Sequence, residues 1–147
     1  MGFFTPDIFC CDLVFLIPDA ILYHFGVLES NVHMSWMRAV CGRLKSDYRY
    51  SKDIVYNNFP WPDHSPEQKE KIEKTAQGIL DARALYPDSS LADLYDPLTM
   101  PPELRKAHQK NDAAAMQAYG MPIKDTDEAA CVAWLMKLYQ EKVNNME

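Results

Sequence analysis

The expected structure of this chain changes within one stretch, Phe59-Pro60-Trp61-Pro62-Asp63-His64-Ser65-Pro66-Glu67-Gln68. Its first two prolines hold the backbone extended and exclude a helix there. Ser65 then suits a helix N-cap, with proline at the first helical position and Gln68 completing a capping box. We therefore expect two domains, one over residues 1–62 and a helical one over residues 63–147.

The sequence after this stretch predicts a bundle of three helices plus a short one. The first helix carries Ile72, Ile79 and other apolar residues at helical spacing on one face. Ser90 is placed to cap a short turn, a longer helix is expected over residues 104–119, and residues 125–128 are placed to cap the last helix. We expect this helical half to fold as a separable unit.

The sequence before the stretch mixes short strand-like runs with one helix. The apolar run at residues 13–17, closed by a Pro-Asp turn, predicts a buried strand, and residues 21–28 predict a second strand. Residues 31–44 carry apolar side chains at three- and four-residue steps, which indicates an amphipathic helix of about three turns. Residues 48–50 and 54–56 are typical of strands or extended segments.

The expected fold class is α+β and predominantly α-helical, with a small β-containing part followed by a helical bundle. If residues 1–62 are only part of a larger sheet, their strands lack the neighbouring strands with which they would form backbone hydrogen bonds. We therefore expect strands in residues 1–62 to be few or rearranged.

The net charge of −6 argues at first against a nucleic-acid partner, because phosphate contacts need Lys and Arg. The charge is unevenly distributed along the chain. Residues 1–30 carry four acids and no Lys or Arg, residues 31–62 carry five basic residues against two acids, and residues 63–147 have a net charge of −5. Only residues 31–62 therefore resemble a surface for a polyanion.

Composition and motifs exclude several classes of protein. The four cysteines show no C-x-x-C spacing, which is typical of reduced thiols in a cytoplasmic protein. The apolar stretch at residues 13–28 is too short and too interrupted for a membrane span. No glycine-rich phosphate loop, G-x-S-x-G or H-E-x-x-H motif occurs, so we expect no catalytic residue and no cofactor site in this chain.

Two arrangements that resemble metal chemistry are better explained otherwise. The four histidines are scattered without ligand spacing, so we expect packing or surface roles and no metal site. Asp63, Glu67 and Lys69 match the letters of a nuclease pattern. They lie on a proline linker and a first helical turn, whereas such carboxylates must converge on a metal from rigid elements.

Residues 43–52 hold the strongest candidate site. If this segment is extended, alternation puts Lys45, Asp47 and Arg49 on one face. Lys and Arg donate to guanine N7 and O6 and Asp accepts from cytosine N4, so the three side chains carry both signs needed to read a base pair. The alternative is a solvated, self-paired ladder of charges on an edge strand.

Polar residues around this trio are candidates for DNA backbone contacts that fix the register of the protein on the duplex. They are Arg43, Tyr48, Tyr50, Ser51, Lys52 and Asn57.

The chain resembles MmeI-like adenine-specific DNA methyltransferases, large restriction–modification proteins that are often of the fused type IIG kind. Residues 17–62 resemble the end of their target-recognition domain, and residues 63–147 resemble their helical C-terminal domain. The matching segments are Ile17-Pro18-Asp19-Ala20, Leu22-Tyr23-His24-Phe25-Gly26-Val27-Leu28, His33-Met34-Ser35-Trp36, Gly42-Arg43-Leu44-Lys45-Ser46-Asp47-Tyr48-Arg49-Tyr50-Ser51, Val55-Tyr56-Asn57-Asn58-Phe59-Pro60-Trp61-Pro62, Leu91-Ala92-Asp93-Leu94-Tyr95-Asp96 and Met100-Pro101-Pro102.

The resemblance implies a parent protein that transfers a methyl group from S-adenosylmethionine to adenine N6. In the family the catalytic Asn-Pro-Pro-Tyr and the glycine motif for the cofactor lie in an upstream methyltransferase domain, and an N-terminal nuclease is common. Neither the Asn-Pro-Pro-Tyr motif nor the glycine motif occurs in this sequence. The family's base-reading side chains fall in residues 45–49. The implied partners are double-stranded DNA, through residues 31–62, and the upstream methyltransferase domain.

A rival interpretation is a helical protein-interaction module that does not bind DNA. Salt dependence separates the two interpretations, because only duplex binding would weaken steeply as salt rises.

Overall fold

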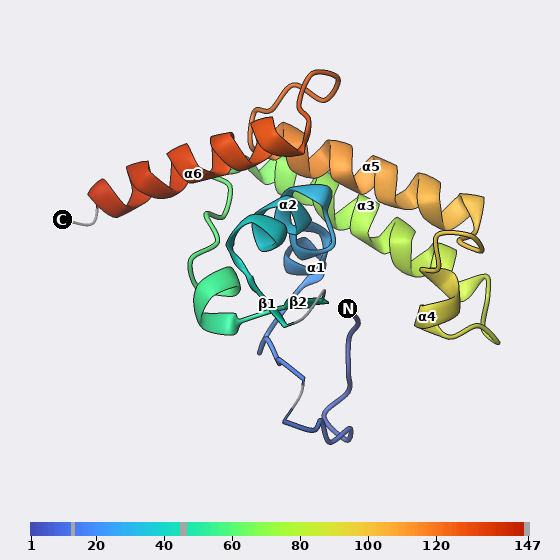
Figure 1. The fold of residues 1–147 in the computed structure, drawn as a ribbon. Coiled ribbons are helices and arrows are strands. Elements are labelled where there is room, and N and C mark those ends of the chain that lie inside the picture. Colours follow the sequence, from blue (N-terminus) through green and yellow to red (C-terminus); the bar gives the residue numbers. More distant parts are fainter. Residues whose placement is uncertain (13, 45–46, 146–147) are drawn as a thin grey trace.

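A computed structural model of the chain describes residues 1–12, 14–44 and 47–145, with the side chains of residues 43 and 44 left aside. Most of it is helical, and the expected predominantly helical fold class is confirmed (Figure 1). The elements are α1 (Leu22–Leu28), α2 (Asn31–Val40), β1 (Gly42–Leu44), β2 (Asp47–Arg49), the π-helix η1 (Lys52–Tyr56), α3 (Pro66–Ala84), α4 (Leu91–Leu94), α5 (Pro102–Ala118) and α6 (Glu128–Asn144).

Helices α3, α4 and α6 begin where their capping residues predict, whereas α5, expected over residues 104–119, spans Pro102–Ala118 and has no side-chain cap. Ser65 accepts a hydrogen bond from the Gln68 backbone N–H, and the Gln68 side chain accepts one from the Ser65 N–H. Ser90 and Asp93 form the same reciprocal pair at the start of α4, and the Asp127 side chain caps α6 by accepting from the Ala130 backbone N–H. Each cap satisfies backbone N–H groups that the first helical turn leaves unpaired.

Three expectations for the first half are wrong. Residues 22–28 of the expected second strand form α1, with Ile21 at its N-cap, because periodicity alone does not separate a short buried helix from a buried strand. Residues 54–56 lie in η1, where the Ser51 hydroxyl accepts from the backbone N–H of Ile54. Residues 14–17 form no strand, and Leu13, the first residue of the expected strand, lies outside the described residues.

The helix expected from residue 31 is confirmed, although it is shorter than the pattern indicates. α2 ends at Val40, and residue 44 belongs to β1. The Pro18-Asp19 turn is also present, with Asp19 at a φ of 55°. A short polar side chain such as aspartate tolerates this left-handed conformation better than most residues.

Helices α3 and α5 lie side by side, with α1 against α3 and α2 against α6 (Figure 1). The larger apolar core takes Val32 and Trp36 from α2 together with Ile72 from α3 and Leu135 from α6. Both halves of the sequence therefore contribute to one core. This shared core favours a single cooperative unit over the separable helical unit that the sequence predicts.

The two halves approach each other closely at Gly26 of α1. A Cβ atom built there would lie 2.6 Å from Cγ2 of Ile72 and 3.1 Å from Oδ1 of Asn111. The buried Asn111 side chain donates a 2.7 Å hydrogen bond to the Gly26 carbonyl oxygen. Glycine is needed here because any side chain would push α1 away from α3.

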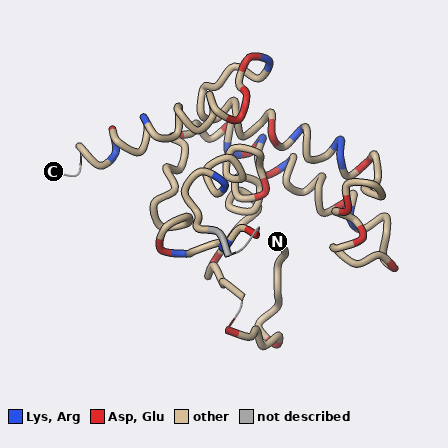
Figure 2. Tube along the Cα trace, in the orientation of Figure 1, with Lys and Arg blue, Asp and Glu red and all other residues tan. Residues whose placement is uncertain are grey.

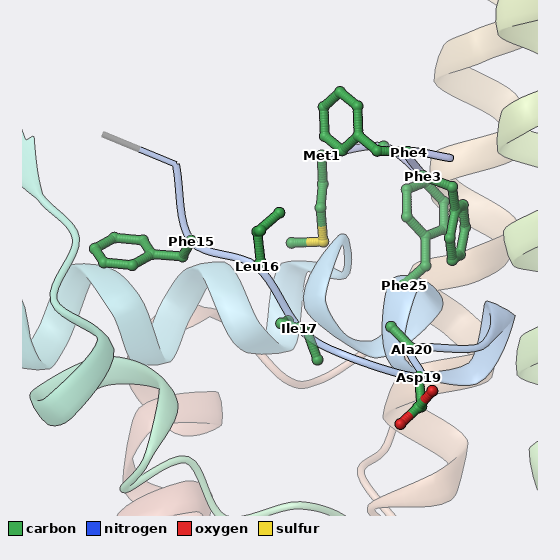
Figure 3. A pocket seen from close by; sticks show the side chains of 10 residues that line it. Met1, Phe3, Phe4, Phe15, Leu16, Ile17, Asp19, Ala20 and Phe25 are labelled. Carbon is green, nitrogen blue, oxygen red and sulfur yellow. The ribbon is translucent and has the colours of Figure 1, made fainter. Parts of the chain in front are cut away.

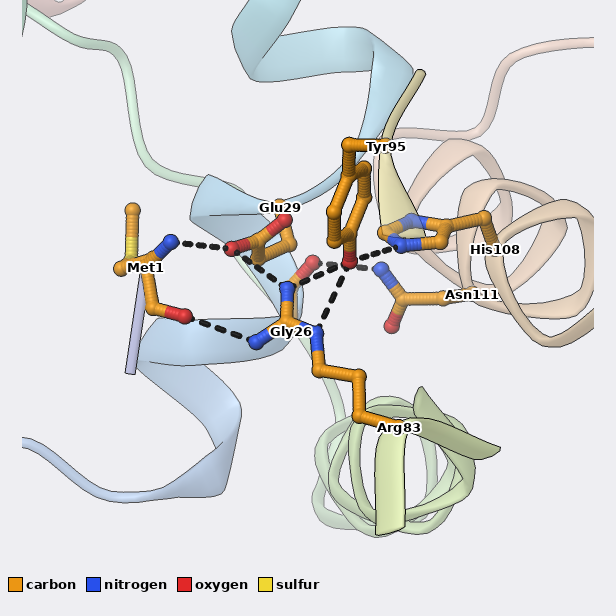
Figure 4. A network of polar contacts seen from close by, with 7 residues as sticks. All are labelled: Met1, Gly26, Glu29, Arg83, Tyr95, His108 and Asn111. Carbon is orange, nitrogen blue, oxygen red and sulfur yellow. Dashed lines mark hydrogen bonds and ion pairs between the residues drawn. The ribbon is translucent and has the colours of Figure 1, made fainter. Parts of the chain in front are cut away.

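A polar network around Arg83 joins four helical elements (Figure 4). Its guanidinium donates to Glu29, at the end of α1, and to the hydroxyl of Tyr95, which follows α4. The Tyr95 hydroxyl also shares a 2.6 Å hydrogen bond with Nε2 of His108 on α5. The amino group of Met1 lies 3.0 Å from Glu29, so the start of the chain is tied to the same network.

Candidate nucleic-acid interface

The segment predicted to read bases forms an antiparallel hairpin. β1 and β2 pair in a register that places Gly42 opposite Arg49 and Leu44 opposite Asp47. The expectation of extended backbone at residues 48–49 is thereby confirmed. Lys45, in the connection between the two strands, lies outside the described residues.

Asp47 and Arg49 are exposed on β2. Alternation along a strand puts them on the same face. Arg49 lies opposite a glycine, and a Cβ at Gly42 would meet no atom within 4 Å, so the space beside the arginine is open. Within the described part of the chain, neither residue has an ion-pair partner. Asp47 and Arg49 are therefore available to a ligand and are not paired with each other.

Tyr50 anchors the base of the hairpin to α2. Its hydroxyl shares a 3.1 Å hydrogen bond with Nε2 of His33, and its ring lies 6.0 Å from the Phe15 ring. Burial raises the pKa of Tyr50 to about 12 and lowers the pKa of His33 to about 4. Both groups are thus neutral near pH 7, and the hydroxyl predicted to meet a phosphate is engaged inside the protein.

A second anchor holds η1, which follows the hairpin. The buried indole N–H of Trp36 donates a 3.0 Å hydrogen bond to the Val55 carbonyl oxygen. The Phe59 ring packs edge-on against His33, with ring centroids 4.6 Å apart. His33 and Trp36 lie three residues apart on α2, so one face of this helix positions both the hairpin and η1.

The other predicted backbone contacts gather around η1. Ser51 caps it, Lys52 is exposed with its Nζ 3.8 Å from Asp53, and the Asn57 amide donates to the same carboxylate. Tyr48 is exposed on β2 and has an interaction partner within the protein. The side chain of Arg43 lies outside the described part of the chain.

Sequence reasoning did not identify His33 and Trp36 as the supports of this site. A usable signal was present for Trp36, which belongs to the apolar stripe that predicts α2, whereas His33 lies beside that stripe and is buried as well. The contacts themselves join residues 17 and 19 positions apart, and spacing along the chain does not predict such pairs.

The N-terminal segment, residues 1–20, lies beside this region and leaves many apolar side chains exposed. Phe9 is fully exposed, and Leu16 is 62% exposed. The segment curls over α1, where Phe3 packs on Phe25 (Figure 3). A groove of about 590 Å³ lies between this segment, Tyr50 and η1.

The arrangement defines a class of protein, a helical module with a short charged hairpin exposed on its surface. In the described ranges, no group of three or more His, Cys, Asp or Glu side chains is placed to hold a metal ion. None of the helices in these ranges is long and apolar enough to cross a membrane.

The chain belongs to the MmeI family. The family model for the MmeI target recognition domain matches residues 1–63, and the model for the MmeI C-terminal domain matches residues 64–147. The resemblance identified from the sequence is therefore confirmed.

Two similar proteins are much longer than this chain. DNA methyltransferase A of Bacillus subtilis (strain 168) is 44% identical over 141 residues, which cover 96% of this chain and 16% of that protein. The structure of the type IIL restriction-modification enzyme MmeI in complex with DNA matches with a TM-score of 0.82 and 50% identity. That match covers 87% of this chain and 17% of the MmeI chain. This chain thus spans about a sixth of the length of either protein.

Proposed function

We propose that this chain is the DNA-reading and C-terminal helical region of an S-adenosylmethionine-dependent adenine-N6 DNA methyltransferase of a restriction–modification system. Support comes from membership of the MmeI family and from similarity to a DNA methyltransferase and to a structure solved with DNA. The observation that carries the proposal is the exposed pair Asp47 and Arg49, free of ion-pair partners in the described residues.

Base reading rests on chemical complementarity. Guanine offers only acceptors, N7 and O6, to the major groove, and these suit Lys45 or Arg49. The paired cytosine offers its N4 donor, which suits Asp47. We assign Lys45 and Asp47 to one G·C pair, with Arg49 reading or positioning next to it. A hairpin of two strands is narrow enough to enter the major groove.

Register on the duplex comes from residues beside the hairpin. Lys52 is exposed and paired only loosely with Asp53, so its ammonium is available to a phosphate. Arg43, Tyr48, Ser51 and the amide of Asn57 complete the backbone contacts that we propose. Tyr50 acts in this scheme through its hydrogen bond to His33, which fixes the hairpin on α2.

We propose that methyl transfer takes place in the part of the parent that lies outside this chain. The sequence has no glycine-rich cofactor loop, and its closest strings, at residues 57–60 and 100–103, lack the Asn-Pro-Pro-aromatic order. That order would hold a flipped adenine. The residues present therefore do not fit S-adenosylmethionine.

In this proposal the apolar N-terminal segment contacts the part of the parent protein that carries out methyl transfer. Phe9, Leu16 and their neighbours expose more apolar surface than a polar environment favours. We propose that residues 1–20 pack against the methyltransferase domain of the parent. A helical protein-interaction module without DNA affinity remains the alternative, and steep salt dependence of duplex binding counts against it.

The test is a charge reversal in the full-length parent, Lys45→Glu with Asp47→Arg. It should favour the opposite orientation of the G·C pair, because each wrong base costs about 1–3 kcal/mol. Sequencing of methylated sites reads the change. Lys52→Ala is the control and should weaken binding to all sequences alike. Unchanged methylation of the original site by the double variant would refute the base-reading roles.

A further inference from the structure

A second charged surface lies between α3 and α5, on helices that contribute nothing to the hairpin. A groove of about 570 Å³ runs along their seam. Its floor is made of small residues, and a Cβ atom added at Gly78 would meet no atom within 4 Å. Its rims carry four lysines, two on each helix, which are Lys71, Lys74, Lys106 and Lys110.

The charged side chains that line the groove are mainly basic, although the surrounding sequence is acidic overall. Residues 63–147 have a net charge of −5, yet Glu103 is the single acid among the residues that line the groove. The Glu103 carboxylate is engaged, because it accepts a 2.9 Å hydrogen bond from the Tyr86 hydroxyl. The basic positions of α3 and α5 follow the two adjacent helices in Figure 2.

These lysines are largely unpaired. Among the described residues, Lys74, Lys106 and Lys110 have no ion-pair partner, and Lys71 donates to the amide oxygen of Gln117. Glu67 precedes Lys71 by one helical turn, as Glu70 precedes Lys74, and neither acid forms an ion pair with another described residue. Like charges that line one groove repel one another, and an anion bound between them relieves this repulsion.

We propose that this groove binds the phosphodiester backbone of duplex DNA, as a second contact surface beside the hairpin. The proposal rests on the proposed function, since it assumes that the chain acts on DNA. Lysines three and four residues apart lie about 4.5–6 Å apart along a helix. One DNA strand carries a phosphate about every 3.4 Å along the duplex axis, so a backbone laid along the seam meets several lysines at once. The contact is independent of base sequence.

Gly78 provides the sharpest test, because a side chain fits there without a clash. Gly78→Glu places a negative charge on the floor of the groove, and Gly78→Gln is the neutral control of equal size. Binding of a labelled duplex of arbitrary sequence to this chain is measured by fluorescence anisotropy at low salt. We expect about a tenfold loss for the glutamate variant relative to the glutamine variant. Equal affinities would overturn the proposal.

A second pair of variants separates a local groove from general charge. One neutralises Lys74, Lys106 and Lys110 to glutamine, and the control neutralises Lys69, Lys124 and Lys137 outside the groove. The slope of log affinity against log salt should flatten by about 3 in the groove variant, because each phosphate contact contributes about 1. It should change little in the control. Equal changes in both variants would refute a specific groove.

The outcomes distinguish this proposal from the base-reading proposal. Groove variants should weaken binding to every duplex and leave the methylated sequence of the parent unchanged, whereas hairpin variants should change that sequence. Loss of binding in the groove variants with no effect of the hairpin variants would keep the groove and remove the base-reading roles. A wild-type chain without affinity for duplex DNA at low salt would overturn the groove proposal, whereas the methylated sequence of the parent's hairpin variants decides the base-reading roles.

Discussion

Residues 1–20 and the α3–α5 pair are both rich in apolar side chains, yet only the second region buries them. Ile72, Ile79 and Leu104 are completely buried between helices, whereas Phe9 is completely exposed. The helices make their own backbone hydrogen bonds and meet partners within this chain. Residues 14–17 form no strand in this chain. An apolar run therefore becomes core only where the fold brings a matching surface to it.

This comparison also separates two kinds of interface. The exposed apolar side chains of residues 1–20 suit a dry contact, such as the one that we propose with a methyltransferase domain. The hairpin and the α3–α5 groove expose charge, in keeping with a wet contact with a polyanion. In Figure 2 the N-terminal segment shows no basic position, in agreement with the absence of Lys and Arg from residues 1–30.

The largest predicted effect comes from removing α1 and α2. A chain that begins at residue 65 loses Val27, Val32 and Trp36, each of which contributes about 1.5–3 kcal/mol by burial. This loss is comparable to the 5–15 kcal/mol stability of a typical domain, so we expect no cooperative unfolding transition by circular dichroism. A chain that begins at residue 20 is the control and should unfold cooperatively. A cooperative transition in the shorter chain would restore the separable unit that the sequence predicts.

An intermediate effect is expected from the buried His33. Burial lowers its pKa from 6.5 to about 4, so between these values the unfolded chain binds a proton that the folded chain does not. The free energy of unfolding should therefore fall by about 3 kcal/mol as the pH drops from 6.5 to 4. Denaturant titrations at several pH values measure it. In the His33→Phe variant the free energy of unfolding should depend less on pH between 6.5 and 4. If its pH dependence is unchanged, other titratable groups cause it.

The smallest effect concerns two glycines in contrasting environments. Gly26→Ala should destabilise the protein by about 1–2 kcal/mol, because overpacking against Ile72 outweighs the gain in helix propensity. Gly78→Ala meets open space and should stabilise by up to about 1 kcal/mol. Thermal unfolding of both variants gives the comparison. If both variants shift the melting temperature in the same direction, the close approach of α1 to α3 is contradicted.

Local signals in the sequence determined the helical half. The caps at Ser65, Ser90 and Asp127 act within a few residues of themselves, so they predict where α3, α4 and α6 begin whatever surrounds them. The charged face of β2 was predictable for the same reason, since alternation along a strand depends only on neighbouring residues. The resemblance to the MmeI family added the functional assignment that composition left open.

Only the tertiary structure decided the rest. Residues 22–28 became α1 because Gly26 permits close packing on Ile72 of α3, 46 positions away in the chain. Tyr50 faces inward because His33 lies beneath it, and the four lysines of the groove meet because α3 and α5 pack side by side. Such contacts depend on how distant elements pack, and a pattern read along the sequence carries no information about which surfaces meet.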